Sequence, residues 1–194
     1  MMRKLVLMIV GWLPLFCIGQ NAEAFYDVGN GLFQNQKYHK AGNYYTQALA
    51  IKEKPRYYYA RAMVLLKMNR EEEALADLNS CLLLKEVGEA YYHRAGILLN
   101  RGMNSAALAD YSKAKEMLPH FVETNYFLGY LYYLEQEYEL ALKYFNEYDV
   151  KKDKDHKYYY YKGLAESKLH MKDTAMKNIK KAAKMKVKYM ENIQ

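Results

Sequence analysis

The chain has 194 residues, and its hydrophobic content of 52% excludes a chain that is disordered throughout. Only 3 prolines and 10 glycines occur, which favours long helices over a turn-rich β fold. The net charge of +7 is uneven, because residues 151–194 contain 13 lysines and 5 acids, whereas residues 1–150 contain 16 basic and 17 acidic residues. A basic end attracts anionic surfaces, but a solvated helix face has the same composition.

The N-terminal segment, residues 1–24, has the composition of an export signal. Two basic residues precede an apolar run, residues 5–16, which is shorter than the roughly 20 residues of a membrane span. Small residues follow at two places, so cleavage is expected either after Gly19 or after Ala24. Cys17 adds the alternative of a lipid anchor, and an uncleaved segment would itself be an anchor. We expect residues 1–24 to be a signal peptide and the protein to be periplasmic, envelope-associated or secreted.

Behind this segment the sequence repeats itself at a nearly constant period. An alanine followed four positions later by a large apolar residue occurs five times, at Ala41, Ala74, Ala107, Ala141 and Ala175. A second small residue lies twelve positions before each of these alanines, at Gly29, Ala62, Ala95, Gly129 and Gly163. Spacings of three and four residues place side chains on one face of a helix. Each unit is therefore predicted to be a pair of helices that pack small residues against large ones.

This pattern resembles the tetratricopeptide-repeat family, whose unit of about 34 residues has the same order of small, aromatic and alanine positions. The third unit carries the resemblance best, through Tyr91, Ala95, Leu98, Ala107, Tyr111, Ala114 and Pro119. The resemblance implies an all-α, right-handed α-solenoid of about five helix-turn-helix repeats. We expect the array to occupy residues 25–187 and a C-terminal tail to follow at residues 188–194.

Several local features fit this arrangement. Asn69 precedes three acids, a pattern that predicts an N-cap for the second helix of unit two. Residues 151–155 are predicted to form a charged turn, since the repeat phase runs through them. Cys81 is the single cysteine after the signal segment, so we expect it to be buried in the core. The lysine-rich segment 180–188 is predicted to be the polar cap that a solenoid needs at its end.

Signatures of catalysis are lacking in the sequence. The five histidines are scattered and have no metal-ligand spacing. No phosphate-binding loop, dinucleotide-binding motif or nucleophile elbow is present. We therefore predict a protein that binds and does not catalyse, with no cofactor and no metal.

The resemblance also implies a recognition surface, because the first helices of such repeats line a concave groove. A tyrosine occupies the same groove position in every unit, at Tyr26, Tyr59, Tyr92, Tyr126 and Tyr160. The further groove candidates are Asn30, Met63, Tyr130 and Tyr133. Rigid aromatic side chains suit peptide binding. The alternative is that these tyrosines only pack between neighbouring helices.

Together these patterns predict an interaction scaffold whose partner is a protein or a peptide segment. Two other classes stay open. One is a module that binds carbohydrate or an envelope polymer, because exposed aromatic rings stack on sugars. The other is docking of the basic C-terminal end on an anionic surface, and membrane contact through this end or through a retained N-terminal segment is open as well. The export signal argues against nucleic acid as the partner.

Overall fold

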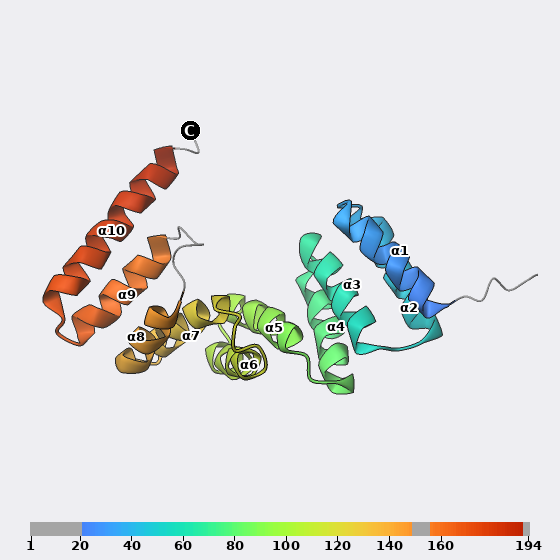
Figure 1. The fold of residues 1–194 in the computed structure, drawn as a ribbon, viewed down its shortest axis with the longest axis horizontal. Helices are drawn as coiled ribbons and strands as arrows, with labels where there is room; N and C mark the ends of the chain where they lie inside the picture. The colour runs from blue at the N-terminus through green and yellow to red at the C-terminus, as the bar shows by residue number, and fades with distance from the viewer. Residues whose placement is uncertain (1–20, 149–155, 192–194) are drawn as a thin grey trace, which may run out of the picture.

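The computed structural model describes residues 21–148 and 156–191, with the side chains described as far as residue 187. These residues form ten α-helices arranged in an arc, with α1–α2 at one end and α9–α10 at the other (Figure 1). The helices are α1 (Ala22–Gln34), α2 (Tyr38–Ile51), α3 (Pro55–Lys67), α4 (Glu71–Leu84), α5 (Gly88–Asn100), α6 (Asn104–Met117), α7 (Glu123–Leu134), α8 (Tyr138–Glu147), α9 (His156–Lys168) and α10 (Lys172–Glu191). The apolar run and Cys17 of the expected signal, and the expected charged turn at 151–155, lie outside the described residues.

The helices associate as five consecutive pairs. Each odd-numbered helix, called here a first helix, packs against the second helix that follows it, and each second helix packs against the next pair. A chain in which every unit contacts mainly its neighbours is a solenoid. The prediction of an all-α solenoid of about five repeats is therefore confirmed. The last helix extends to Glu191, so it continues into the predicted tail.

Small residues on the first helices allow the two helices of a pair to approach closely. A Cβ atom added at Gly129 would lie 2.8 Å from Cδ1 of the buried Phe145 ring. At Gly29, it would lie 2.5 Å from Cε1 of the buried Tyr45 ring. The predicted packing of small residues against large ones is confirmed at these contacts.

The turn between the two helices of a repeat contains one residue in the left-handed region at the same phase of every unit. The φ angles are 58° at Gln36, 57° at Asn69, 72° at Gly102, 64° at Gln136 and 60° at His170. After α3, the N–H of Arg70 donates to the carbonyl oxygen of Leu65 at 2.9 Å, which closes the end of that helix. The N-cap predicted for Asn69 is wrong. Its tolerance of the left-handed conformation is used to end α3, and α4 has no side-chain cap.

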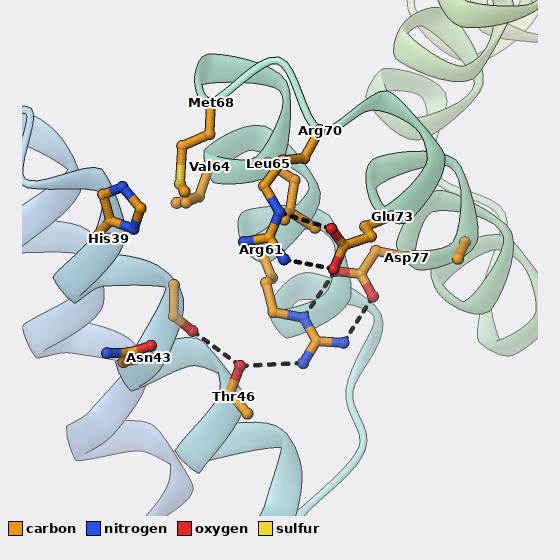
Figure 2. Close-up of a pocket in the computed structure, with 12 residues that line it drawn as sticks. His39, Asn43, Thr46, Arg61, Val64, Leu65, Met68, Arg70, Glu73 and Asp77 are labelled. Carbon is orange, nitrogen blue, oxygen red and sulfur yellow. Dashed lines mark hydrogen bonds and ion pairs between the residues drawn. The ribbon is translucent and has the colours of Figure 1, made fainter.

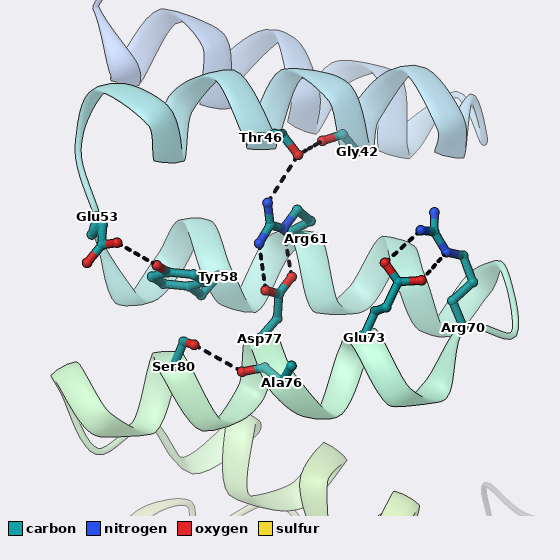
Figure 3. Close-up of polar contacts among 10 residues, drawn as sticks. All are labelled: Gly42, Thr46, Glu53, Tyr58, Arg61, Arg70, Glu73, Ala76, Asp77 and Ser80. Carbon is teal, nitrogen blue, oxygen red and sulfur yellow. Dashed lines mark hydrogen bonds and ion pairs between the residues drawn. The ribbon is translucent and has the colours of Figure 1, made fainter.

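An arginine that binds an aspartate of its own repeat and a polar side chain of the preceding repeat recurs in repeats two and three. Arg61 of α3 donates from Nε and Nη2 to the two carboxylate oxygens of Asp77 in α4, at 2.8 and 2.7 Å. Its Nη1 donates to Oγ1 of Thr46 in the preceding repeat at 3.1 Å, as Figure 3 shows. The same contacts recur one repeat later among Arg94, Asp110 and Asn79. Each arginine therefore links three helices across a repeat boundary.

Cys81 lies in the core formed by α3, α4 and α5, with no exposed surface. Burial raises the pKa of its thiol to about 11, so the neutral form persists at physiological pH. The predicted burial of this cysteine is confirmed.

The first helix begins at Ala22, ahead of the expected start of the array at Phe25. The side chain of Asn21 accepts a hydrogen bond from the N–H of Glu23 at 3.0 Å and caps α1. The carboxylate of Glu23 accepts a hydrogen bond from the hydroxyl of Tyr57 at 2.8 Å, and it pairs with Lys54 and Arg56. The segment just before Phe25 thus joins repeat one to repeat two.

We expect Gly129→Ala to lower the free energy of unfolding by about 1–3 kcal/mol, because the added methyl group overlaps a buried ring. Gly31→Ala is the matched control. It is also a helical glycine, but no atom lies within 4 Å of its added Cβ. Its expected effect is a gain of about 0.5–1 kcal/mol from helix propensity. Urea unfolding followed by circular dichroism measures both, and equal effects at the two sites would contradict the close-packing account.

A chain that begins at Phe25 should unfold at lower urea concentration than one that begins at Gln20, because it lacks Asn21 and Glu23. The lost N-cap alone corresponds to about 1 kcal/mol. Contacts led by the Tyr57 hydrogen bond lower the pKa of Glu23 below its ordinary value of 4.5.

A carboxylate with a lowered pKa stabilises the fold fully above its ordinary pKa and loses this effect as the pH falls through the folded-state value. The difference between the two chains should therefore be largest at neutral pH and narrow below about pH 4.5. Equal unfolding curves at pH 7 would show that residues 20–24 add nothing to the array.

Candidate functional site

A groove of about 680 Å³ crosses three consecutive first helices, α5, α7 and α9. Its aromatic lining consists of Tyr92, Tyr126, Phe127, Tyr130, Tyr148 and Tyr161. Its polar lining consists of Asn100, Asn104, Glu123 and Lys157. Three repeats therefore contribute aromatic side chains to one continuous surface.

The tyrosines of this groove are held by other rings. Tyr92 meets Tyr111 of its own repeat edge to face, with ring centroids 5.5 Å apart, and it meets Phe121 at 4.8 Å. Tyr126 packs against Tyr148 at 5.8 Å. Tyr92 and Tyr126 are both partly buried. These rings thus pack between helices and also line the groove, so the two interpretations open at the sequence level are not exclusive.

Tyr161 joins α9 to α7 and was not among the predicted groove residues. Its ring centroid lies 4.6 Å from that of Tyr130 and 5.7 Å from that of Tyr133. The repeat phase favoured Tyr160, the preceding residue, because it assumed that α9 stacks on α7 as the earlier first helices stack on one another. The run of four tyrosines at 158–161 was the available signal, but it does not indicate which ring faces the groove.

Among the predicted groove residues, the structure brings Tyr92, Tyr126 and Tyr130 together in this groove. Tyr133 lies beside it, in contact with Tyr161. Tyr160 lies away from the groove, 44% exposed, next to α10.

The predicted residues of the first two repeats lie outside this groove, mostly in contacts between helices. Tyr26 packs on Tyr57 of the next repeat at 5.0 Å, and the guanidinium of Arg56 lies 5.1 Å from its ring centroid. Asn30 accepts a hydrogen bond from the hydroxyl of Tyr45 at 2.8 Å. Tyr59 and Met63 pack against the core around Cys81.

The groove carries little charge. Burial raises the pKa values of Tyr92 and Tyr161 to about 12, so both hydroxyls stay protonated at neutral pH. Each remains available as a hydrogen-bond donor and acceptor. Of the lining residues, only Glu123 and Lys157 carry formal charges. This surface is therefore suited to an apolar or neutral segment.

A second pocket, of about 400 Å³, lies between α2, α3 and α4 and is polar (Figure 2). Its charged side chains bind one another: Arg61 holds Asp77, and Arg70 donates to both oxygens of Glu73 at 2.6 and 2.7 Å. Since these charged side chains neutralise one another, the pocket serves to join α2, α3 and α4. Sequence reasoning missed it, although the same spacing of an arginine and a following aspartate occurs in two successive repeats, at Arg61 with Asp77 and at Arg94 with Asp110.

In residues 21–148 and 156–191, no three His, Cys, Asp or Glu side chains gather closely enough to hold a metal ion. None of the helices described is both long and apolar enough to span a bilayer.

The second repeat, residues 55–87, matches the tetratricopeptide-repeat family model. Among curated proteins, nothing matches the chain. Solved structures do share its fold. YrrB, a TPR protein with an unusual peptide-binding site, is 20% identical with a TM-score of 0.74, over 88% of this chain and 89% of that one.

Two further structures are similar over most of their length. MamA from Desulfovibrio magneticus is 18% identical with a TM-score of 0.69, over 86% of this chain and 96% of that one. PilF from Pseudomonas aeruginosa is 15% identical with a TM-score of 0.64, over 84% and 76% respectively. At these identities the likeness shows the fold. The tetratricopeptide-repeat model is matched by repeat two, and the other four repeats consist of the same kind of helix pair.

Proposed function

We propose that this protein is a non-enzymatic scaffold that binds a peptide segment of a partner protein in the groove across α5, α7 and α9. One observation carries this function: aromatic side chains from three repeats converge on one groove while neighbouring rings hold them in place. The peptide-binding site of the similar protein YrrB is consistent with such a use of the fold.

Ring packing prepares the groove for binding before any ligand arrives. The Tyr92 ring is fixed edge to face by Tyr111 and Phe121, so little side-chain freedom is lost when a ligand covers it. Tyrosine also offers a large apolar face together with a hydroxyl that can hydrogen-bond. Rigid rings with polar tips favour the capture of mixed apolar and polar segments.

The shape of the groove indicates an extended ligand. Packed helices lie about 10 Å apart, so a surface across three helices is about 20 Å long. An extended segment of about six residues covers this length. The amides of Asn100 and Asn104 in the lining can pair with the backbone of such a segment.

A peptide fits this surface better than a sugar. Sugar stacking needs an exposed ring face, whereas Tyr92, Tyr126 and Tyr130 are all partly buried by neighbouring rings. Side chains of a peptide can enter between such rings. The lining contains no histidine or cysteine, and partial burial holds the hydroxyls of Tyr92 and Tyr161 in the neutral form, which favours binding over catalysis.

Export is part of the same proposal and rests on the signal-like composition of residues 1–24. The state of the remaining cysteine is compatible with an oxidising compartment. Cys81 is fully buried and its thiol pKa is raised, so it is protected from oxidation.

Leu134→Glu should weaken peptide binding at least about tenfold, because it places a charge in an apolar lining. Leu140→Glu is the matched control, since both leucines are 39% exposed but only Leu134 lines the groove. A random peptide library is panned against the purified chain, and the affinity of the enriched peptides for each variant is measured by calorimetry.

Leu140→Glu should leave these affinities unchanged. Equal losses for the two variants would place binding outside the groove. A library from which nothing is enriched, combined with signals on a glycan array, would favour the carbohydrate alternative.

A further inference from the structure

The last helix carries positive charge that its surroundings do not compensate. Up to residue 187, α10 contains six lysines and one acid, Asp173. None of these lysines forms an ion pair with a carboxylate in the part of the chain that the structure describes. By contrast, all five arginines after residue 20 are paired with carboxylates. The arginines along the array are therefore neutralised, whereas the lysines of α10 up to residue 187 have no carboxylate partner in the described residues.

Three lysines of α10 form a face on one side of an apolar stripe. Residues three, four and seven positions apart share a face of a helix. The lysine face contains Lys177, Lys180 and Lys184, all exposed. The apolar stripe beside it contains Met176, Ala183 and Val187, and the exposed fractions of Met176 and Val187 are 54% and 58%.

A slot of about 450 Å³ between α9 and α10 extends this stripe. Its apolar lining is Tyr160, Tyr161, Ile179, Ala182 and Ala183. Two lysines, Lys157 and Lys186, also line it. The apolar surface of the last repeat is thus bordered by lysines on both sides.

This surface lies at the free end of the solenoid. Helix α10 packs mainly on α9 and is the outermost element at that end of the arc (Figure 1). A solenoid end needs a polar cap, which was the role expected of the lysine-rich segment. The exposed Tyr160, Met176 and Val187 show that this end is instead amphipathic.

We propose that the outer face of α10, together with the slot beside it, binds the surface of a bilayer that contains anionic phospholipid. A basic helix with an apolar stripe lies in the plane of such a surface, with its apolar side chains at the acyl boundary. Lysines reach outward from the stripe to the phosphates through their long apolar stems. The apolar slot accommodates part of a lipid whose phosphate the exposed lysines of α10 neutralise.

Charge argues against a second copy of the chain as the occupant. Two C-terminal ends would bring two sets of unpaired lysines together, which costs energy. The N-terminal end offers few carboxylates in exchange, because Glu23 is already bound to Lys54, Arg56 and Tyr57. An anionic bilayer offers many phosphates at once. The slot shares Lys157 and Tyr161 with the groove, but the lysine face, Met176 and Val187 do not line the groove. Substitutions at these positions of α10 therefore test the bilayer site without altering the groove.

The full chain is mixed with vesicles of phosphatidylcholine alone or of phosphatidylcholine with phosphatidylglycerol, and bound protein is measured by sedimentation. Binding to the neutral vesicles measures how much the N-terminal segment contributes to membrane binding. We expect the anionic vesicles to bind at least about a hundredfold more tightly, with an advantage that falls as salt rises.

The triple variant Lys177→Gln, Lys180→Gln and Lys184→Gln should reduce this advantage about a hundredfold, since each lysine near such a surface contributes about fivefold. The matched control is Lys37→Gln, Lys40→Gln and Lys52→Gln, which removes the same charge from exposed positions on and beside α2. All six lysines are exposed, so neither variant should unfold. Equal losses in the two variants would overturn the site on α10.

The double variant Met176→Ser and Val187→Ser separates lipid from other polyanions. It should weaken vesicle binding several-fold while leaving any binding to heparin unchanged, because only a bilayer receives the apolar stripe. Unchanged vesicle binding by this variant, or no preference of the unmodified chain for anionic vesicles, would overturn the proposal.

Discussion

The contact between a small residue on each first helix and a large residue on its partner sets the geometry of the whole array. At Gly29 and Gly129, ring atoms occupy the space where a Cβ would lie, so the two helix axes come close. The distance between the two axes of a pair then fixes where the second helix packs against the following repeat. Because the units stack in one dimension, this contact also decides which side chains of separate repeats meet in the groove.

The two halves of the array are joined differently. Repeats two and three carry the Arg61–Asp77 and Arg94–Asp110 contacts, which satisfy buried carboxylates with bidentate hydrogen bonds. The equivalent positions in repeat four are Leu128 and Tyr144, so the two helices of that repeat are joined by apolar and ring contacts such as Tyr132 with Tyr144. The aromatic groove lies in this second half. Where aromatic contacts join the helices, partly buried rings also remain available at the surface.

Charge follows a similar division along the chain. Arginines from α3 to α6 and the turns beside them are neutralised by carboxylates of the same or neighbouring repeats. The lysines of α10 up to residue 187 have no such partners in the described residues. Its Lys181 instead lies 4.0 Å from the ring centroid of Tyr159 and donates to that hydroxyl. The solenoid therefore has paired arginines in its middle and a basic end, and the aromatic groove across α5, α7 and α9 has only Glu123 and Lys157 as charged lining residues.

The sequence by itself determined the helix pairs, their number and the burial of residues such as Cys81, because these follow from a local pattern of small and large residues that recurs in every repeat. It also indicated that Tyr92, Tyr126 and Tyr130 share a surface. It did not distinguish Tyr160 from Tyr161, misassigned Asn69 as an N-cap, and missed the contact of Arg61 with Asp77. These features depend on how one repeat is rotated against the next and on the left-handed turn inside each unit. Only the tertiary structure decides them, since that rotation results from packing between helices that local sequence spacing does not specify.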